Sequence, residues 1–288
     1  LLYPDCNNEA YEDAEFFGLA WVNEGGCEYI EIDDLRRDER AQAFLASQDS
    51  KAGFDVKHLM HLFEHVQIPV NGLDFDCWIP AFLSDGTITS YDAFAEKFKI
   101  DRKLTSDDVY GKKGRPQLSD ELSRIEYVKI QAHGCYAAIE QLKKELAEKE
   151  LNSLFYDIEM PVTKVLFEME NNGICTDLNV LNEIAENTNQ KVLALTKQIY
   201  EAAGHEFNIN SPKQLAVVLF DELGLKAGKK RSTAVDVLEK LMNAHPIIPL
   251  LMEHRKFQKV YSTYAIGLAK HVKADGKIHT LFNQCLTT

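Results

Sequence analysis

Three histidines form the clearest arrangement of candidate metal ligands in this sequence. His58, His61 and His65 follow one another at spacings of three and four residues, so a helix would place them on adjacent turns. That spacing can bind zinc. No further ligand is evident nearby, however, and a zinc site needs clustered ligands. The pattern therefore favours a partly exposed histidine face over a metal site.

Several carboxylates of the same region could hold a divalent cation, because hard cations prefer oxygen ligands. Asp55 directly precedes a run of apolar residues with helical spacing, which is the position of a helix N-cap. Asp74 and Asp76 are expected to end a strand or to cap a helix. The acidic residues of segment 31–40 are expected in a solvated loop and at a helix start, where negative charge is favourable. Capping and solvation are preferred to metal binding at these positions.

Cations form the second chemical group, and they gather at the carboxyl end. The net charge is −13, and residues 1–150 alone carry −13, whereas residues 211–288 hold twelve Lys and Arg against six Asp and Glu. The loop 226–233 and the helix from His254 combine these cations with Ser, Thr and Tyr hydroxyls. Such a mixture suits a phosphate backbone. A solvated helix face with a polar tail is the alternative.

The elements that position the first group indicate an α/β layer fold. Segments 16–22 and 27–32 are rich in aromatic and β-branched residues and flank a turn, which predicts a hairpin. A short buried strand is expected over 51–54, and a loop over 101–116. Helices are expected over 37–48, 56–66, 75–83, 91–98 and, as one long helix or two joined ones, 118–151. Strands followed by interleaved helices favour the α/β class.

The second half is predicted to be helical. A helix over 154–170 stops at Asn171-Asn172-Gly173, and the next helix, capped by Thr176, runs to Ala203. These two long helices are expected to lie antiparallel. The inward face of the second is predicted to hold Leu178, Leu181, Ile184, Thr188, Val192, Leu195 and Ile199.

A helix start is also predicted near residue 211, with another one after the basic loop. Ser211 has the character of an N-cap, Pro212 suits the first helical position and Gln214 completes a capping box. Thr233 is expected to cap a helix over 234–242. Free backbone N–H groups at such helix starts are ready anion sites.

The amino-acid sequences of several segments resemble those of the bacterial family A DNA polymerases. KVYSTYAIGL (259–268) and DGKIHTLFNQCLTT (275–288) resemble the thumb helix of that family and the strand that follows it. NINSPKQL (208–215) and KKRST (229–233) resemble the tip of the same thumb. Residues 51–86 resemble the family's 3′–5′ proofreading exonuclease domain, which has a ribonuclease H-like fold. The resemblance covers essentially all of the chain.

For the thumb, the resemblance implies contacts with primer–template DNA. The residues that it points to are Asn208, Asn210, Ser211, Lys213, Lys230, Arg231, Ser232, Thr233, Arg255, Lys259, Ser262, Thr263 and Tyr264, with Asn283 and Gln284 near the primer strand. Ser211 and Thr233 would be caps with or without DNA, and Tyr264 could belong to the core with only its hydroxyl outside. The Lys residues and Arg231 are favoured as DNA contacts.

For the exonuclease domain, the resemblance implies that some of the metal ligands needed for catalysis are missing. That reaction needs about four acidic residues that hold two metal ions. The family has an Asp at the position of Leu59, another at the position of Gly134 and a helper Tyr at the position of Ile130. Its first acidic pair would fall near Tyr3 and Asp5. Leu and Gly cannot ligate a hard cation, so no exonuclease activity, no catalytic residue and no metal site are expected.

The sequence therefore predicts an inactive α/β ribonuclease H-like exonuclease domain over 1–150, followed by a mostly α-helical thumb over 151–288, α+β overall. In the family, palm and fingers would follow Thr288, and the first Met is Met60, so we expect a piece of a longer polypeptide that does not polymerise by itself. The whole enzyme would extend a primer with deoxynucleotides by means of Mg²⁺ in replication and repair; no cofactor is expected in this stretch.

Composition sets the expected location, and two other functions stay open. The six cysteines lie far apart, which indicates free thiols in a reducing cytosol. No run of about 18 apolar residues is present, so we expect a cytoplasmic protein without a membrane partner. One alternative is an active metal-dependent 3′–5′ exonuclease with differently placed carboxylates. The other is a helical interaction module without a nucleic-acid role.

Overall fold

The chain divides into two compact units. The computed structural model describes residues 1–7, 14–112, 114–226 and 231–286. The first unit comprises Leu1–Asn171 with Leu281–Thr288, and the second comprises Asn172–Thr280. This division falls later than the boundary that the sequence predicts at residue 150. The reason is that the chain after residue 150 still packs on the first unit, where Phe155 is a fully buried part of the core.

A five-stranded mixed sheet organises the first unit, in the order β3-β2-β1-β4-β5. Its strands are β1 (Leu2–Cys6), β2 (Phe16–Asn23), β3 (Gly26–Glu31), β4 (Lys51–Gly53) and β5 (Leu73–Asp76). β1, β2 and β3 pair antiparallel, whereas β4 runs parallel to both β1 and β5. Asn23 pairs with Gly26 across the turn. The predicted hairpin and the predicted short strand at 51–54 are therefore confirmed.

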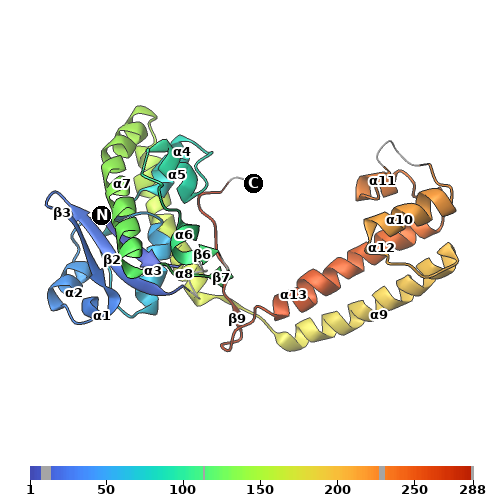
Figure 1. Cartoon of the computed structure of the whole chain (residues 1–288). Helices are drawn as coiled ribbons and strands as arrows, with labels where there is room; N and C mark the ends of the chain where they lie inside the picture. Colours follow the sequence, from blue (N-terminus) through green and yellow to red (C-terminus); the bar gives the residue numbers. More distant parts are fainter. Residues whose placement is uncertain (8–13, 113, 227–230, 287–288) are drawn as a thin grey trace. The chain divides into compact units, whose positions relative to one another are not determined.

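Helices cover both faces of the sheet (Figure 1). Successive strand residues point to opposite faces, so Leu19 of β2 packs with α1 (Ile32–Leu35), α2 (Glu39–Ala46) and α3 (Val56–His65). Its neighbour Ala20 packs instead with α6 (Ser106–Tyr110) and α7 (Glu121–Glu148). This layering confirms the predicted α/β class for the first part of the chain.

The remaining helices of the first unit form a second layer of core. They are α4 (Trp78–Ser84), α5 (Tyr91–Lys97), the π-helical turn η1 (Leu154–Glu159) and α8 (Met160–Asn172). The helix predicted over 75–83 begins only at Trp78, because Phe75 still belongs to β5. The loop predicted over 101–116 contains α6, capped by Thr105, and a short hairpin of β6 (Gly111–Lys112) and β7 (Arg115–Pro116).

The second unit is helical, as predicted. It contains α9 (Leu178–Ala203), α10 (Pro212–Val217), η2 (Val218–Glu222), α11 (Val235–Glu239), α12 (Ile247–Lys259), η3 (Val260–Ala265) and α13 (Ile266–Ala269), with a two-stranded ribbon of β8 (Ile174–Cys175) and β9 (Lys277–Ile278). α12 runs back along α9 in the opposite direction (Figure 1). Within the second unit, the antiparallel partner of α9 is therefore α12, whereas the helix predicted over 154–170 belongs to the first unit as η1 and α8.

Three local predictions in this unit need correction. The cap of α9 is Asp177, whose side chain accepts from the backbone N–H groups of Asn179 and Val180, rather than Thr176. The face of α9 predicted to point inward is only partly buried, since Leu178 and Ile184 are exposed. The helix predicted over 234–242 is shorter, because α11 ends at Glu239.

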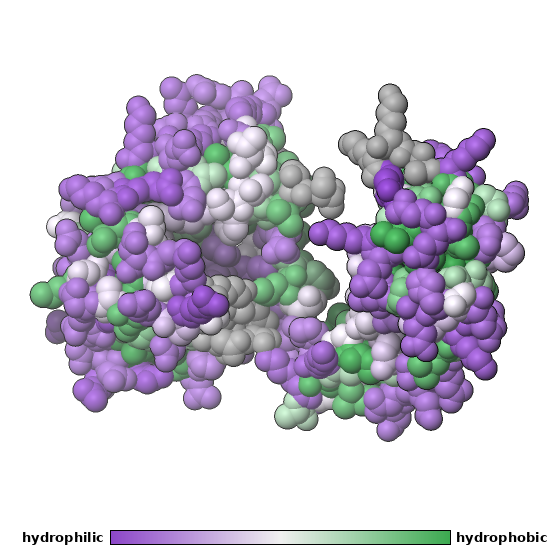
Figure 2. All heavy atoms as spheres, turned by 45° about the vertical axis from the view of Figure 1, so that its right-hand side comes forward, coloured by the Kyte–Doolittle hydropathy of each residue, from purple (hydrophilic) through white to green (hydrophobic). Residues whose placement is uncertain are grey.

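The surfaces of both units are predominantly polar. Figure 2 shows hydrophilic side chains over most of the visible face of each unit, with hydrophobic residues scattered among them. Among the described residues, no helix combines the length and the apolar character that a bilayer span requires. All six cysteines are free thiols.

Candidate functional site

Asp5 carries a carboxylate at one of the positions where the resemblance places exonuclease metal ligands. It is fully buried. Its Oδ2 accepts from the Tyr29 hydroxyl at 2.6 Å and from Arg124 Nε at 2.7 Å, and its Oδ1 accepts from the Tyr110 hydroxyl at 2.7 Å. Burial opposes the charge of Arg124, but the bond to Asp5 raises its pKa overall. A guanidinium group therefore compensates the charge of this carboxylate.

Tyr3 and Leu59 lie at two other positions where the resemblance places metal ligands. The Tyr3 ring packs edge-on against Tyr91, with 6.1 Å between ring centroids, and burial raises the pKa of its phenol. Leu59 is fully buried and belongs to the same core cluster as Leu2 and Phe63. A neutral phenol and an alkyl chain are not ligands for a hard cation.

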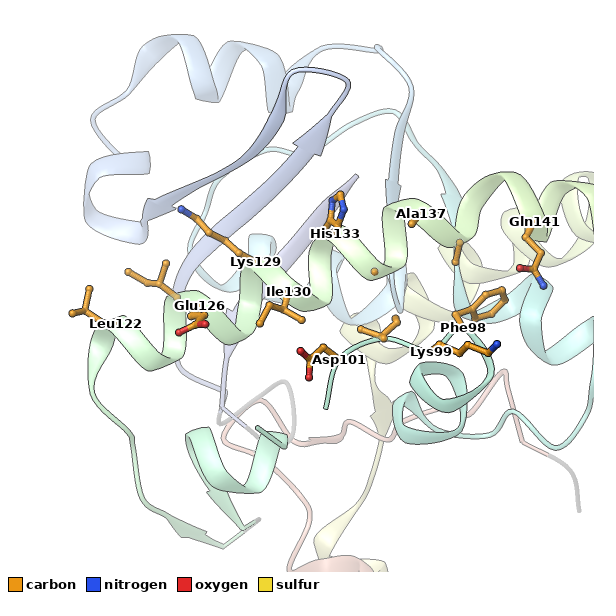
Figure 3. A pocket seen from close by; sticks show the side chains of 14 residues that line it. Phe98, Lys99, Asp101, Leu122, Glu126, Lys129, Ile130, His133, Ala137 and Gln141 are labelled. Carbon is orange, nitrogen blue, oxygen red and sulfur yellow. The ribbon is translucent and has the colours of Figure 1, made fainter. Parts of the chain in front are cut away.

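Gly134 and Ile130 line an open pocket of about 680 Å³ along α7. Figure 3 shows Ile130 and His133 on this helix and Phe98, Lys99 and Asp101 on the segment that faces it. Gly134 lies directly against Ile100, because a Cβ placed on it would approach the Ile100 side chain to 2.6 Å. At the position where the resemblance places an acidic side chain, this protein has close packing against an apolar residue.

Two other carboxylates of this region, Asp55 and Asp76, act as caps, as predicted, whereas Asp74 on β5 accepts from the Ser50 hydroxyl. Asp55 accepts from the backbone N–H of His58 at the start of α3. Asp76, at the end of β5, is buried and accepts from the backbone N–H groups of Val56, Trp78 and Ile79. Burial, assisted by the nearby Asp55, raises the pKa of Asp76 to about 7.

The histidines of α3 form only part of the partly exposed face that the sequence predicts. His65 is exposed, but His61 is buried, and its Nε2 lies 2.6 Å from Oε2 of Glu170. His58 Nε2 lies 3.6 Å from the Cys6 sulfur, and burial lowers the pKa of its ring. In the described part of the chain, no group of three or more His, Cys, Asp or Glu is placed to hold a metal ion. Among the residues that the structure describes, the side chains at the positions that the resemblance points to do not form a two-metal site.

In the second unit, the loop before α10 is held by its own side chains. Ser211 caps the helix by accepting from the Gln214 backbone N–H. Gln214 reaches back to the backbone N–H of Asn208 at 2.8 Å, rather than to Ser211 as a capping box would require. Asn208 Oδ1 in turn accepts from the Asn210 backbone N–H. Asn208, Asn210 and Lys213 are exposed, so a rigid loop presents polar side chains to solvent.

The segment after the basic loop is tied to α12. Arg255 is half-buried and donates to the backbone oxygen of Thr233, which is itself buried. The predicted cap at Thr233 is wrong, because the N-cap of α11 is Ala234. Ser232 Oγ accepts from the Ala234 backbone N–H. Arg255 therefore fixes this segment against α12 by a hydrogen bond to its backbone.

Arg231 is exposed, but it is not unpartnered. Its guanidinium pairs with Asp221 at 2.5 Å, and both side chains are about half exposed. The same group lies over the Phe220 ring, 5.9 Å from its centroid. Lys230, predicted as a neighbouring DNA contact, lies outside the described residues.

A polar stripe follows the end of α12 into η3. Lys259, Ser262, Thr263 and Tyr264 are all exposed. Ser262 donates to the backbone oxygen of Gln258, which leaves its oxygen accessible as an acceptor. Tyr264 is 49% exposed, so it is not a core residue. The π-helical geometry of η3, which is frequent at functional sites, widens the turn at this stripe.

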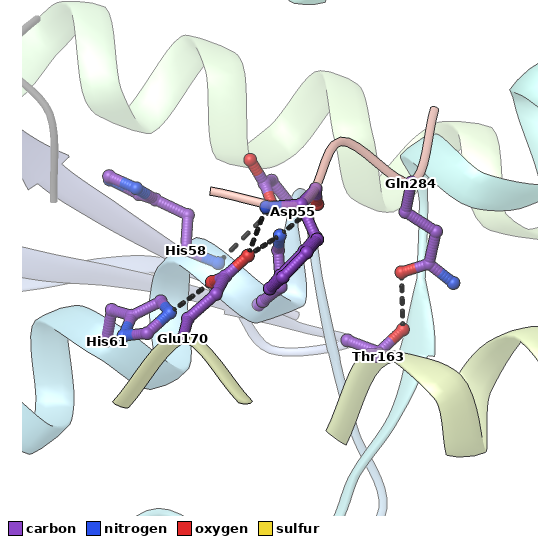
Figure 4. A network of polar contacts seen from close by, with 8 residues as sticks. Asp55, His58, His61, Thr163, Glu170 and Gln284 are labelled. Carbon is purple, nitrogen blue, oxygen red and sulfur yellow. Dashed lines mark hydrogen bonds and ion pairs between the residues drawn. The ribbon is translucent and has the colours of Figure 1, made fainter. Parts of the chain in front are cut away.

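Asn283 and Gln284 lie on the carboxyl-terminal segment of the first unit, in two different environments. Asn283 is exposed. Gln284 points inward, where its Nε2 donates to the backbone oxygen of Glu159 at 2.9 Å and its Oε1 accepts from Thr163 Oγ1 at 3.0 Å (Figure 4). The neighbouring Phe282 is held through its backbone by Glu170 and Lys57.

Sequence reasoning missed Arg124 and Glu170, the two charged residues that organise these regions. Both are buried and both have partners more than a hundred residues away in the chain. The only hint in the sequence is their position within apolar helical stretches, where a charge needs a partner. Which partner that is depends on the tertiary fold.

Two family models match this chain. The model for DNA polymerase family A matches residues 178–288. The model for the ribonuclease H-like domain of DNA polymerase I matches residues 2–138, which confirms the predicted fold of the first unit.

Named relatives and a solved structure agree with those matches. DNA polymerase I of Lactococcus lactis is 38% identical over 292 residues, which cover all of this chain and 32% of the relative. DNA polymerase I of Geobacillus stearothermophilus is 35% identical over 99% of this chain and 34% of the relative. The polymerase domain of Pol1 from M. smegmatis, in complex with DNA primer-template and dNTP, superimposes with a TM-score of 0.79 at 29% identity, over 96% of this chain and 47% of that chain. The chain thus spans about a third of the length of these curated relatives.

Proposed function

Since this chain belongs to family A of the DNA polymerases, we propose that its second unit binds the duplex of primer and template DNA without reading the base sequence. The observation that carries the proposal is the exposed polar stripe of α12 and η3 together with the rigid loop at Asn208–Lys213. Lys213 and Lys259 have no ion-pair partner among the described residues, so both charges are available to phosphate groups.

The comparison with the M. smegmatis structure supports this choice of ligand, because that protein is in complex with DNA primer-template and dNTP. For the complete enzyme we propose template-directed addition of deoxynucleotides in replication and repair, with Mg²⁺ as the metal. The part of that work proposed for the residues described above is to hold the duplex.

We further propose that the first unit is not an exonuclease. Two of the four ligand positions are Leu59 and Gly134, whose side chains cannot bind Mg²⁺. A third, Asp5, has its oxygens engaged by Arg124 and two tyrosines. Incubation with 3′-labelled single-stranded DNA and Mg²⁺ or Mn²⁺ tests this. Nucleotide release that a chelator abolishes would overturn it.

Duplex binding is tested by the fluorescence anisotropy of a labelled primer–template across a salt titration. Each phosphate that the protein neutralises adds about 0.9 to the slope of log affinity against log salt concentration. Lys259→Ala is expected to weaken binding similarly for unrelated DNA sequences and to lower the slope by about 1. Lys197→Ala is the matched control, because Lys197 is exposed on α9 on the side away from the buried face at Leu195 and Ile199.

Three outcomes would refute the proposal. An affinity that does not change with salt concentration would exclude binding through phosphate contacts. Equal losses for Lys259→Ala and Lys197→Ala would show that only net charge matters. Absence of any duplex binding at low salt would favour the alternative of a helical interaction module.

A further inference from the structure

The carboxyl-terminal segment 282–285 is held against the first unit by two side-chain clasps, and Asn283 lies between them. At the first clasp, the Phe282 backbone N–H donates to Glu170 Oε1 at 2.7 Å, and Lys57 Nζ donates to the Phe282 backbone oxygen. Both polar groups of this one peptide residue are therefore bonded by side chains. Such double engagement fixes the backbone as a neighbouring strand would.

Glu170 is the centre of the first clasp. It is fully buried in α8, and it bonds Lys57 and His61 of α3 as well as Phe282 (Figure 4). Burial opposes ionisation of this carboxyl, but the bonds from His61 and Lys57 lower its pKa overall. A buried carboxylate with a cation and several donors is costly to disturb, because each removed partner leaves a desolvated polar group.

The second clasp holds residue 284. Gln284 Nε2 donates to Glu159 twice, at its backbone oxygen and at Oε2, and Gln284 Oε1 accepts from Thr163. Both ends of the amide are engaged. The next residue, Cys285, is buried in the core of the first unit. The side-chain amide of Gln284 is therefore hydrogen-bonded within the protein, whereas the resemblance implies a direct DNA contact for this residue.

Asn283 is the exposed residue between these fixed points. The residues on both sides of it point inward or are bonded through the backbone. Its amide, which offers both a donor and an acceptor, has no hydrogen-bond partner among the described residues.

We propose that Glu170 is a positioning residue for a nucleic-acid contact at Asn283, so that the first unit presents this amide to a DNA strand in a fixed orientation. The inference rests on the proposed function, since it names the residue that would hold a contact for the same ligand in place. It gives the first unit a role in binding that needs no nuclease chemistry.

The test is a double-mutant cycle on the full 288-residue chain, with affinity for labelled primer–template duplex as the readout. Asn283→Ala is expected to weaken binding by about 3- to 10-fold, the value of one hydrogen bond. Glu170→Gln is expected to weaken it by a similar factor. The double variant should be no weaker than Asn283→Ala alone, because an alanine side chain has no amide whose contact a displaced segment could lose. The salt slope should be unchanged in all three.

Glu168→Gln is the matched control, since Glu168 is exposed on the same helix and should leave binding unchanged. If Glu170→Gln unfolds the first unit, Thr163→Val takes its place in the double-mutant cycle with Asn283→Ala. That change removes the hydroxyl that bonds Gln284 and so loosens the same segment. Effects of Glu170→Gln and Asn283→Ala that multiply would overturn the inference, as would Asn283→Ala with no effect.

The proposed function and this inference can fail separately. If Lys259→Ala lowers the salt slope while Asn283→Ala and Glu170→Gln leave affinity unchanged, duplex binding stands and the positioning role of Glu170 falls. If the unmodified chain does not bind the duplex at low salt, both fall together.

Discussion

The two units differ in whether their important polar side chains are buried or exposed. In the first unit, the charged residues that matter most, Asp5, Arg124 and Glu170, are buried and bonded to other side chains or to the backbone. In the second unit, the side chains of Asn208, Lys213 and Lys259 are exposed, while the backbone beneath them is fixed by caps and helix bonds.

This difference separates stability from binding. A buried ion pair contributes little net stability compared with an apolar pair, but removal of one partner is severely destabilising. An exposed cation contributes almost nothing to folding and remains available to a ligand. Changes at the Asp5–Arg124 pair should therefore affect the unfolding of the first unit, whereas changes at the exposed stripe should affect affinity. The chain offers a selective probe, because both of its tryptophans, Trp21 and Trp78, lie in the first unit.

The largest expected effect is that of Arg124→Met. The change leaves the Asp5 carboxylate buried beside two tyrosines without its cation, which should cost about 3–5 kcal/mol of unfolding free energy. Urea unfolding followed by tryptophan fluorescence measures this. Lys129→Met, on the same helix, is the control. A loss below about 1 kcal/mol would show that the pair is not a determinant of the first unit's stability.

The second expected effect is a pH dependence from Asp76. Burial raises its pKa to about 7, above the ordinary value of 3.8, so the folded state binds a proton that the unfolded state releases. The stability that this contributes is complete below about pH 3.8 and is lost as the pH rises through about 7. Comparison of the protein with its Asp76→Asn variant, by urea unfolding from about pH 5 to 8, isolates it. We expect the stability of the protein relative to the variant to fall across this range; a constant difference would contradict the prediction.

The helix caps and turns of both units show what the sequence could predict and what it could not. The caps at Asp55 and Ser211 and the turn at Asn23–Gly26 were predictable, because each depends on residues within four positions of one another. The cap of α9 was assigned to Thr176 although Asp177 performs it, since both types are good N-caps and the sequence does not distinguish adjacent candidates.

The site residues follow the same rule. Leu59 and Gly134 could be recognised as unable to bind metal from residue type alone. That Arg124 neutralises Asp5, or that Glu170 bonds Lys57, could not be predicted, because these contacts join segments more than a hundred residues apart. Arg255 was predicted as a DNA contact, but the fold directs it to Thr233, which no local pattern indicates.

A smaller effect is expected from Gly134→Ala. The new Cβ would approach the Ile100 side chain to 2.6 Å, which should cost about 1–3 kcal/mol, while the better helix propensity of Ala returns about 1 kcal/mol. We expect a net loss of about 1 kcal/mol in the tryptophan-detected unfolding. In an Ile100→Ala background the same change should become stabilising. If it stays destabilising there, the contact with Ile100 is not its cause.

The smallest effect concerns Arg231. Among the described cations of the second unit that are candidate DNA contacts, it is the one that forms an ion pair, as Arg124 does in the first unit. Asp221→Ala removes its partner, and because both side chains are about half exposed, the pair contributes only about 0–1 kcal/mol to folding. The freed guanidinium should tighten duplex binding by up to about 5-fold and steepen the salt slope by up to about 1. Glu183→Ala, which removes an exposed charge from α9, controls for net charge. Equal tightening by both variants would mean that Arg231 reaches no phosphate, and that the exposed stripe alone distinguishes the second unit from the first.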